Sequence, residues 1–593
     1  MPTSVHILVV LAGIHGTVRS AGHGGPLAGV RIEIDGGTSL SSDTAGRYAA
    51  TGLEPGPHEI RFLAAGYRIE RATVLLSDSS DLALDIELTP QPLLLSPIEV
   101  VADSARRSPA GSAGLASVVD EAGHYRFTSG WQANQPASAT DIQQLIATIP
   151  GVTTRNDNTT ALSIRGGRGS ENLTLLDGIP IIGAVHFTGA SSAINPDAIA
   201  TVDVHTGVSS ARYDDALSGV VELATADAAP QHAQVTSALT ISDVRSVFQA
   251  PLEPGGSVLL GARSSFRNLL TDGAGFGAVN GYQDFIGAGH LRLGAGTVGM
   301  VAFASDDHLN WQPVADATRS IPADDGSGSA NASTENDAAW RSDAAGITWT
   351  LPGGIGAEWR AAGWWTGSSA SISLQSRGQS QHLTNTFGEL GLSIERRQRY
   401  AASSLVLGGE LKQPRTSYDV ATWYGTQRQD SGFAIATAPL LASLYGEWDW
   451  QASGRLDLRV GTRVSNGAAG VMNIDPRLAL NVQLEPGTRF EAAAGRTHQT
   501  TQSLLNEENL TSTIVGPPLM MLSAAGVPIA TADQWQLGID RQAGNGLAIA
   551  LDAYLRSWYD VVVPATTGAL LAAAMPGIGA GRSRGLLASV SIL

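Results

Sequence analysis

The chain of 593 residues contains no cysteine. This absence excludes disulfides, thiolate nucleophiles and cysteine-based metal sites, and it suits an oxidising compartment, where stray thiols are a liability. The sequence also lacks any apolar run of the 18 or more residues that a membrane-spanning helix needs. A membrane protein with this sequence would therefore have to be a β-barrel, which satisfies its backbone hydrogen bonds between strands.

Charged residues are scarce, at 15% of the chain, compared with about 25% in average proteins. The formal net charge is -17, which argues against a nucleic-acid surface, because such a surface needs clustered cations. Lys412 is the only lysine in the sequence. No nucleic-acid partner is therefore expected.

Aromatic residues make up only 6% of the chain, whereas glycine occurs 69 times. This composition favours long sheets with many tight turns, and the length predicts two or more units. Residues 1–13 contain a short apolar run without a positive N-terminal region or a convincing cleavage site. They are interpreted either as the remnant of a signal peptide or as a first strand.

Residues 14–89 are predicted to form a small β-sandwich, because short strands alternate with turns about every ten residues. Val30, Ile32 and Ile34 alternate onto one face. The unit resembles the carboxypeptidase regulatory-like domain. Its sequence contains neither an HExxH nor an H-x-x-E motif, so zinc peptidase chemistry is not expected. The residues that carry this resemblance are Gly16, Pro26 to Val30, Asp43 to Tyr48, Gly66 and Tyr67.

Residues 90–135 are rich in Pro, Ser, Ala and Arg and are predicted to be a linker. An exposed extended segment can add a strand to the edge of a partner's sheet. The linker contains one such segment, although the residues alone favour a plain linker strand. This segment consists of Ile98, Glu99, Val100, Val101 and Ala102.

Residues 136–228 are predicted to form a compact α+β unit. Thr140 or Asp141 can cap a helix that Pro150-Gly151 would end. Residues 220–223 are expected to form the final strand of the unit. The helix is predicted from apolar residues at i, i+3, i+4 and i+7, namely Ile142, Leu145, Ile146 and Ile149, and a later strand from the alternating Val202 and Val204 before a turn at Gly207.

The stretch SIRGGRGSENLTLLDGIPI, residues 163–181, is glycine-rich like a phosphate-binding loop. A phosphate loop needs glycines that open directly into a helix N-terminus. These glycines instead lead into a β-type run broken by Asp177-Gly178, a dipeptide typical of strand turns. The stretch is therefore predicted to be strand, turn and strand.

Three motifs in a fixed order resemble the plug domain of TonB-dependent outer-membrane receptors. They are the helix that ends in IPGV at 149–152, the stretch at 163–181, and IATVDVHTGVSSARYDDALSGVVELAT at 199–225. The resemblance implies that residues 98–102 are the TonB box, the strand through which such receptors pair with TonB. It also implies that the sandwich is an extra domain in front of that box.

The resemblance further implies structural roles in the core of the plug. A carboxylate is an expected partner for the arginine of this set. The implied residues are Arg165, Gly166, Asp177, Gly178, Gly207 and Gly219.

Residues 229–593 are predicted to form an antiparallel transmembrane β-barrel, because apolar and polar residues alternate in segments separated by turns. Alternation alone would equally fit a soluble sandwich or propeller. The alternating sets are Leu456, Leu458, Val460 and Val464 against Arg455, Asp457, Arg459 and Arg463; Leu478, Leu480, Val482 and Leu484 against Arg477, Ala479, Asn481 and Gln483; and Trp535, Leu537 and Ile539 against Gln534, Gln536 and Asp540.

Two further features favour the barrel. Eleven of the 12 tryptophans lie after residue 230, as interfacial girdles require. Turns at 485–487 and 543–546 are short, whereas residues 313–339 form a long polar stretch. Short turns on one side and long loops on the other are typical of membrane barrels.

The barrel region accommodates roughly 16 strands, whereas receptors of the resembled family have 22 strands around the plug. The final stretch, GRSRGLLASVSIL, is similar to an internal strand of such a barrel. The sequence is therefore expected to be a C-terminally truncated receptor with an incomplete barrel.

The resemblance implies a receptor of the bacterial outer membrane for TonB-coupled uptake of a scarce ligand, such as a siderophore or other metal chelate, cobalamin or a glycan. Its expected partners are TonB, outer-membrane lipid and a small extracellular ligand. No enzyme activity, catalytic residue, cofactor or metal site is predicted, and the ligand-binding residues are not identified. The alternative is a non-transporting binding or signalling protein, or a truncated receptor remnant.

Overall fold

The protein is mostly β, as predicted, and falls into two units, residues 1–96 with 577–580 and residues 97–576 with 581–593. No helix in the described part has the length and apolar character that crossing a membrane requires. The computed structural model describes the chain apart from residues 1–11, 22–24, 36–37, 65–66, 78–80, 90–116, 119–122, 128–140, 155–161, 187–190, 226–229, 241–242, 254, 267–277, 312–335, 377–378, 425–426, 468–469, 486, 505–518, 524–526, 543–546, 564–576 and 593.

The first unit is a sandwich of two four-stranded sheets. One has the order β4-β1-β7 with β8 also paired to β1, and the other has the order β3-β2-β5-β6. Val30, Ile32 and Ile34 are all buried in the core between them, so the predicted apolar face is confirmed. The strands are β1 (Ala12–Ser20), β2 (Arg31–Ile34), β3 (Thr38–Ser41), β4 (Arg47–Leu53), β5 (Gly56–Leu63), β6 (Glu70–Leu76), β7 (Leu82–Ala83) and β8 (Ile86–Leu88).

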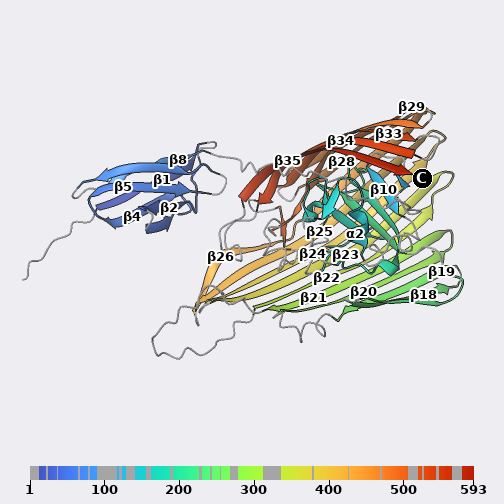
Figure 1. The fold of residues 1–593 in the computed structure, drawn as a ribbon, viewed down its shortest axis with the longest axis horizontal. Helices are drawn as coiled ribbons and strands as arrows, with labels where there is room; N and C mark the ends of the chain where they lie inside the picture. Colours follow the sequence, from blue (N-terminus) through green and yellow to red (C-terminus); the bar gives the residue numbers. More distant parts are fainter. Residues whose placement is uncertain are drawn as a thin grey trace, which may run out of the picture. The chain divides into compact units, whose positions relative to one another are not determined.

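The plug contains a six-stranded sheet with the order β14-β13-β16-β15-β10-β9, and the short helix α2 packs on this sheet. Figure 1 shows its elements α2 and β10 enclosed by a large curved sheet. A separate pair, β11 with β12, completes it. Its elements are β9 (Ser117–Val118), β10 (His124–Phe127), α2 (Ile142–Ile146), β11 (Val152–Thr154), β12 (Leu162–Ile164), η1 (Gly169–Glu171), β13 (Leu173–Leu176), β14 (Ile179–Pro180), η2 (Pro196–Ala198), β15 (Ile199–His205) and β16 (Val220–Thr225).

The plug differs from the sequence-based expectation at two places. Helix α2 ends at Ile146, before the predicted stop at Pro150-Gly151, although Asp141 caps it through the backbone N–H groups of Gln143 and Gln144. Strands β9 and β10 lie within the range assigned to the linker, and β10 pairs with β15 from His124 to Phe127. The alternation in such a short strand is too brief to be visible in a Pro- and Ser-rich stretch.

The large sheet contains 17 antiparallel strands in sequence order. Its strands are β17 (Gln234–Leu239), β18 (Asp243–Leu252), β19 (Gly256–Ser265), β20 (Ala278–Leu293), β21 (Gly296–Trp311), β22 (Asn336–Pro352), β23 (Ala357–Ser376), β24 (Gln379–Arg399), β25 (Ser403–Tyr424), β26 (Gln427–Thr437), β27 (Leu441–Ser453), β28 (Leu456–Asn466), β29 (Met472–Glu485), β30 (Thr488–Gln499), β33 (Ala530–Gln542), β34 (Leu547–Val563) and β35 (Gly577–Ile592). We call this sheet the wall. A short hairpin, β31 (Thr501–Ser503) with β32 (Met520–Leu522), lies outside it.

Two of the wall strands form one interrupted passage. Thr437 of β26 pairs with Thr416 of β25, and Leu441 of β27 pairs with Lys412 of the same strand. The interruption contains Pro439, which cannot donate a hydrogen bond to a sheet. The wall therefore has one passage fewer than its 17 strands, in agreement with the roughly 16 predicted from the sequence.

The two faces of the wall have the predicted polarity. Trp535 and Leu537 are 60% and 54% exposed, whereas the alternating Gln534 and Gln536 are buried and contact the plug. Because the outward row is apolar along many strands, this face suits lipid and the inward face suits a polar interior. The alternation predicted for β33 is confirmed.

The connections also differ between the two ends of the wall. Only two residues separate β29 from β30, whereas residues 312–335 separate β21 from β22. The predicted long loop at 313–339 is therefore shorter, because β22 already begins at Asn336. Within the described residues no pairing joins β17 to β35, so the curved sheet has two edges.

Candidate transport site between plug and wall

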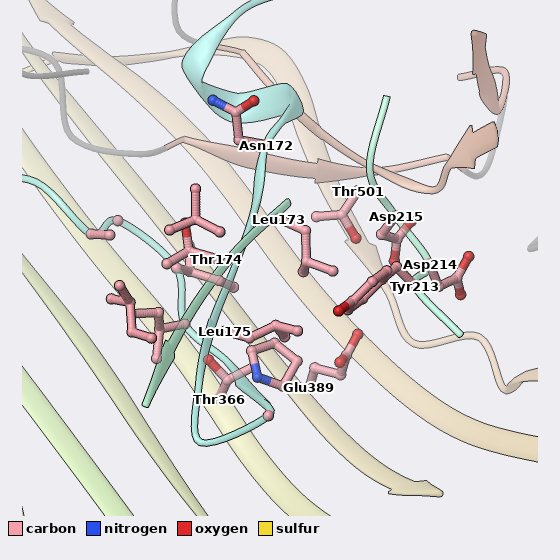
Figure 2. A pocket seen from close by; sticks show the side chains of 18 of the residues that line it. Asn172, Leu173, Thr174, Leu175, Tyr213, Asp214, Asp215, Thr366, Glu389 and Thr501 are labelled. Atoms are coloured by element: carbon pink, nitrogen blue, oxygen red, sulfur yellow. The ribbon is translucent and has the colours of Figure 1, made fainter. Parts of the chain in front are cut away.

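A cavity of about 340 Å³ lies between the plug and the inner face of the wall. Figure 2 shows its lining: Leu173 and Leu175 of plug strand β13 face Glu389 and Thr366 of wall strands β24 and β23, with Tyr213 and Thr501 nearby. The lining combines apolar, hydroxyl and charged side chains. This mixture is typical of a site that binds a small molecule and orients it through a few polar groups.

An inward-folded hairpin borders one part of this cavity. Strands β31 and β32 contribute Thr501, Ser503 and Met520 to the lining. Met521 and Leu522 are each 1% exposed, because they pack among apolar residues of the inner wall. Strands β31 and β32, which belong to the connection between β30 and β33, therefore lie on the inner side of the wall.

A buried ion cluster borders the cavity on the plug side. The ammonium group of Lys412 lies 3.0 Å from Asp214 and 2.9 Å from Asp215. Arg463 lies 3.2 Å from Asp214 and 3.0 Å from Glu410. Burial would raise the pKa of Asp214, but Arg463 and Lys412 outweigh it and lower this pKa. Plug and wall are therefore joined here by charges of opposite sign.

The plug segment that leads into these aspartates, residues 209–213, is also held by wall side chains. Arg477 donates to the carbonyl oxygens of Ser210 and Tyr213. Glu447 accepts from the hydroxyl of Ser210 at 2.8 Å and from the backbone N–H of Ala211 at 2.8 Å. The whole segment 209–215, which we call the clamped segment, is thus bound to the wall by both backbone and side chains.

Arg165 of the predicted plug core is 2% exposed and has a positive φ of 50°. Its Nη1 donates to Oε1 of Gln536 at 2.7 Å, and its guanidinium group lies 5.3 Å from the centre of the Tyr554 ring. Within the described part of the chain, the side chain that accepts a hydrogen bond from Arg165 is thus an amide and not the expected carboxylate. A neutral amide and a ring face replace it, and burial lowers the pKa of Arg165.

Asp177 and Gly178 form a turn between β13 and β14, with φ values of 51° and 84°. Both values lie in the left-handed region that the two central residues of such a hairpin turn require. The carboxylate of Asp177 accepts from the N–H and hydroxyl groups of Thr225, at 2.9 and 2.8 Å. This turn is therefore tied to the end of the adjacent strand β16.

The remaining predicted core glycines lie at close approaches. A Cβ at Gly207 would be 2.0 Å from Oε1 of Gln536, the acceptor of Arg165. A Cβ at Gly219 would be 2.4 Å from Ile164, and one at Gly166 would be 2.5 Å from the hydroxyl of Ser583. Their assigned role in the plug core stays a prediction.

A second buried polar cluster joins plug and wall at His186. Its two ring nitrogens lie 3.0 Å from Asp307 and 2.9 Å from Asp284, and Arg263 donates to Asp284 at 2.7 Å. The ring stacks on Tyr282 at 3.8 Å. Burial would lower the pKa of His186, but Asp284 and Asp307 outweigh it and raise this pKa. With His186 protonated, two anions face two cations.

The raised pKa of His186 predicts that the plug is held less firmly at alkaline pH. A group with a raised folded-state pKa contributes its full stabilisation below its unfolded pKa, about 6.5 for histidine, and loses it as the pH rises through the folded pKa. We expect protease digestion of the plug in the intact protein to become faster as the pH rises from the unfolded pKa of His186 through its folded pKa. His186→Gln should cost about 3–5 kcal/mol and abolish this pH dependence.

His58 offers a matched control for this experiment. It also has a raised pKa, because it hydrogen-bonds to the carbonyl of Glu54 and to Asp35, but it belongs to the sandwich. His58→Gln should leave the pH profile of plug digestion unchanged. An unaltered profile in His186→Gln would contradict the assignment.

Several residues of this site were not identified from the sequence. Arg463 and Arg477 appeared there only as polar members of alternating strands, and Lys412 only as the single lysine. The inward positions of the wall were the available signal, since a buried charge facing the lumen needs a partner. The plug partners could not be assigned, because they depend on how the plug is rotated inside the wall.

Two further points concern the predicted TonB box and metal binding. Residues 98–102, the predicted TonB box, are outside the described residues. No group of three or more His, Asp or Glu side chains that could hold a metal ion occurs among the residues that the structure describes.

Residues 132–220 match the family model of the TonB-dependent Receptor Plug Domain. The chain therefore contains a plug domain of the kind found in TonB-dependent receptors. Residues 13–89 match the Carboxypeptidase regulatory-like domain, in agreement with the resemblance of the sandwich. No curated protein matches the chain.

Solved structures similar to the chain show the same fold. The siderophore receptor PirA from Acinetobacter baumannii has a TM-score of 0.56 at 14% identity, covering 80% of this chain and 78% of that one. A point mutant of the ferric enterobactin receptor PfeA from Pseudomonas aeruginosa has a TM-score of 0.56 at 16% identity, covering 79% and 77%. The ferric citrate transporter FecA, in its unliganded form, has a TM-score of 0.54 at 14% identity, covering 80% and 74%.

Proposed function

We propose that the chain is a receptor that takes up a small ligand across the bacterial outer membrane by a TonB-coupled mechanism. A ferric siderophore or other metal chelate is the proposed ligand class, with cobalamin and glycans as further candidates. The similar structures support this class because they are receptors for siderophores, ferric enterobactin and ferric citrate. No step needs covalent catalysis by this chain.

The observation that carries the proposal is the way the plug is held. A cavity adjoins the plug, but the clamped segment and the two buried ion clusters tie the plug to the wall. Buried pairs of this kind are costly to break one partner at a time. Widening the cavity into a path therefore needs work on the plug, and TonB is the proposed source.

The proposed coupling element is the segment Ile98 to Ala102 in the linker before the plug. An extended segment of this kind would add a strand to a sheet of TonB. Its backbone hydrogen bonds would transmit the force from TonB, and its side chains would set the register of the pairing. Pulling on it would act on β9 and β10, which follow it in the chain and form the edge of the plug sheet.

Cross-linking tests this assignment without knowledge of the ligand. Because the chain contains no cysteine, Val100→Cys places a single thiol in the segment. We expect oxidation of cells that carry a TonB with one cysteine in its periplasmic domain to give a disulfide-linked complex. Leu82→Cys, in the sandwich, is the control. Equal cross-linking of both variants, or none of Val100→Cys, would contradict the coupling role.

A further inference from the structure

The hairpin β31–β32 is bound to both partners between which the cavity lies. On the wall side, the backbone of Met520 makes three hydrogen bonds. Asn385 accepts from its N–H at 2.8 Å, and its carbonyl accepts from Asn385 at 3.0 Å and from the hydroxyl of Thr416 at 2.9 Å. The side chain of Asn385 thus pairs with the hairpin as a neighbouring strand would.

On the plug side, the chain entering the hairpin is bound to the clamped segment. Asp215 accepts from the N–H of Thr500 at 2.6 Å and from its hydroxyl at 2.7 Å. The residue before, Gln499, donates to the carbonyl of Ser170 in η1 at 3.0 Å. The base of the hairpin therefore follows the position of the plug.

One carboxylate connects these contacts to the wall. Oδ1 of Asp215 accepts from Thr500, while its Oδ2 lies 2.9 Å from the ammonium group of Lys412. Asp215 also has a positive φ of 54°, an uncommon conformation for a residue other than glycine. A strained backbone conformation persists only where surrounding contacts hold it in place. For Asp215 these contacts come from the hairpin, the plug and the wall.

We propose that hairpin β31–β32 is a gate over the cavity, latched by the Thr500–Asp215–Lys412 contact. With the latch formed, Thr501, Ser503 and Met520 close the cavity and Lys412 is shielded. A displacement of the hairpin breaks the hydrogen bonds that orient Asp215 and weakens its pairing with Lys412. The hairpin and the clamped segment of the plug therefore open together rather than independently.

The single lysine makes the latch measurable. Lys412 is 5% exposed and is the only side-chain amine in the chain. A small, membrane-impermeant amine-acylating reagent applied to the full receptor in outer-membrane fragments therefore reports at one side chain, and mass spectrometry separates it from the terminal amine. The assay needs neither TonB nor a ligand, so its outcome is independent of the proposed uptake.

Two variants loosen the gate from opposite sides. Thr500→Val removes the hydroxyl bond to Asp215 while keeping the side-chain shape, and Asn385→Ala removes the bonds to Met520. Each should raise the acylation rate of Lys412 by about fivefold or more, as expected for the loss of a buried hydrogen bond. Neither substitution touches Lys412 directly, so both act through the hairpin.

The controls are a neighbouring threonine and a buried wall residue. Thr497→Val changes a buried threonine of β30 that does not line the cavity, and Ser368→Ala changes a buried side chain on wall strand β23. Both should stay within about twofold of the unmodified receptor. Faster acylation in both loosening variants supports the latch. Acylation that is unchanged in either of them, or equally raised in the controls, overturns it.

Discussion

A disulfide between plug and wall should stop uptake through the receptor. Ala211 lies in the clamped segment, and a Cβ built at Gly461 of β28 would be 3.2 Å from the Cβ of Ala211. Disulfides have Cβ–Cβ distances of about 3.5–4.5 Å, so a shift of a few tenths of an ångström accommodates the bond. Because the chain has no other cysteine, Ala211→Cys with Gly461→Cys forms a single defined tether.

We expect import of iron-55 from a ferric chelate to fall to background in the oxidised double variant and to recover on reduction. The hydrogen bonds from Glu447 and Arg477 to the clamped segment can be replaced by hydrogen bonds to water when the segment moves. A disulfide cannot be replaced in this way. The single variants Ala211→Cys and Gly461→Cys should import in both redox states. Full import through the oxidised double variant would show that the clamped segment stays in place during transport.

A proline in the proposed coupling segment should have an effect of similar size by a different route. Proline at position 100 removes a backbone N–H and restricts the preceding residue, so Val100→Pro weakens strand pairing with TonB. Energised import should fall to background, while binding of the same chelate to cells at equilibrium should stay unchanged. Import is lost because TonB no longer pulls on the plug, while the ligand-binding site is unchanged.

The control for this variant is a proline elsewhere in the same linker. Ser108→Pro lies outside the coupling segment and should import normally, because this stretch is already rich in proline. If Val100→Pro imports at the unmodified rate, the coupling segment lies elsewhere. If it also loses binding, the substitution acts on the fold and not on coupling.

Much of the fold could be predicted from periodicity. Most strands of the wall are long, and their two faces meet different environments. The exposed Trp535, Leu537 and Ile539 therefore alternate clearly with the buried Gln534 and Gln536. The sandwich strands follow the same rule on a smaller scale. Strands β9 and β10 escaped prediction because two to four residues carry too little periodic signal.

The candidate site was predicted less completely, for physical reasons. Local features such as the Asp177-Gly178 turn depend on residues close in sequence, and these were recognised. Lys412 and Asp215 are far apart in the chain, and nothing in either stretch specifies the partner. The same applies to Arg165, whose partner Gln536 became evident only once the plug was placed against β33.

The inward hairpin was missed for a related reason. In a barrel, a long connection between two strands is expected to extend outward. Nothing in the sequence near Met520 contradicts that expectation, because the buried contacts of the hairpin come from Asn385, Thr416 and Asp215. Only the three-dimensional arrangement shows that this connection turns inward.

The most direct test of the account is the dependence of import on the energised inner membrane. Cells that lack their own ferric-chelate receptors and express this chain are given an iron-55 chelate, with and without a protonophore. The account predicts import that stops when the proton gradient collapses, while surface binding persists. Import that continues at the same rate without the gradient would contradict it, because the plug would then open without TonB.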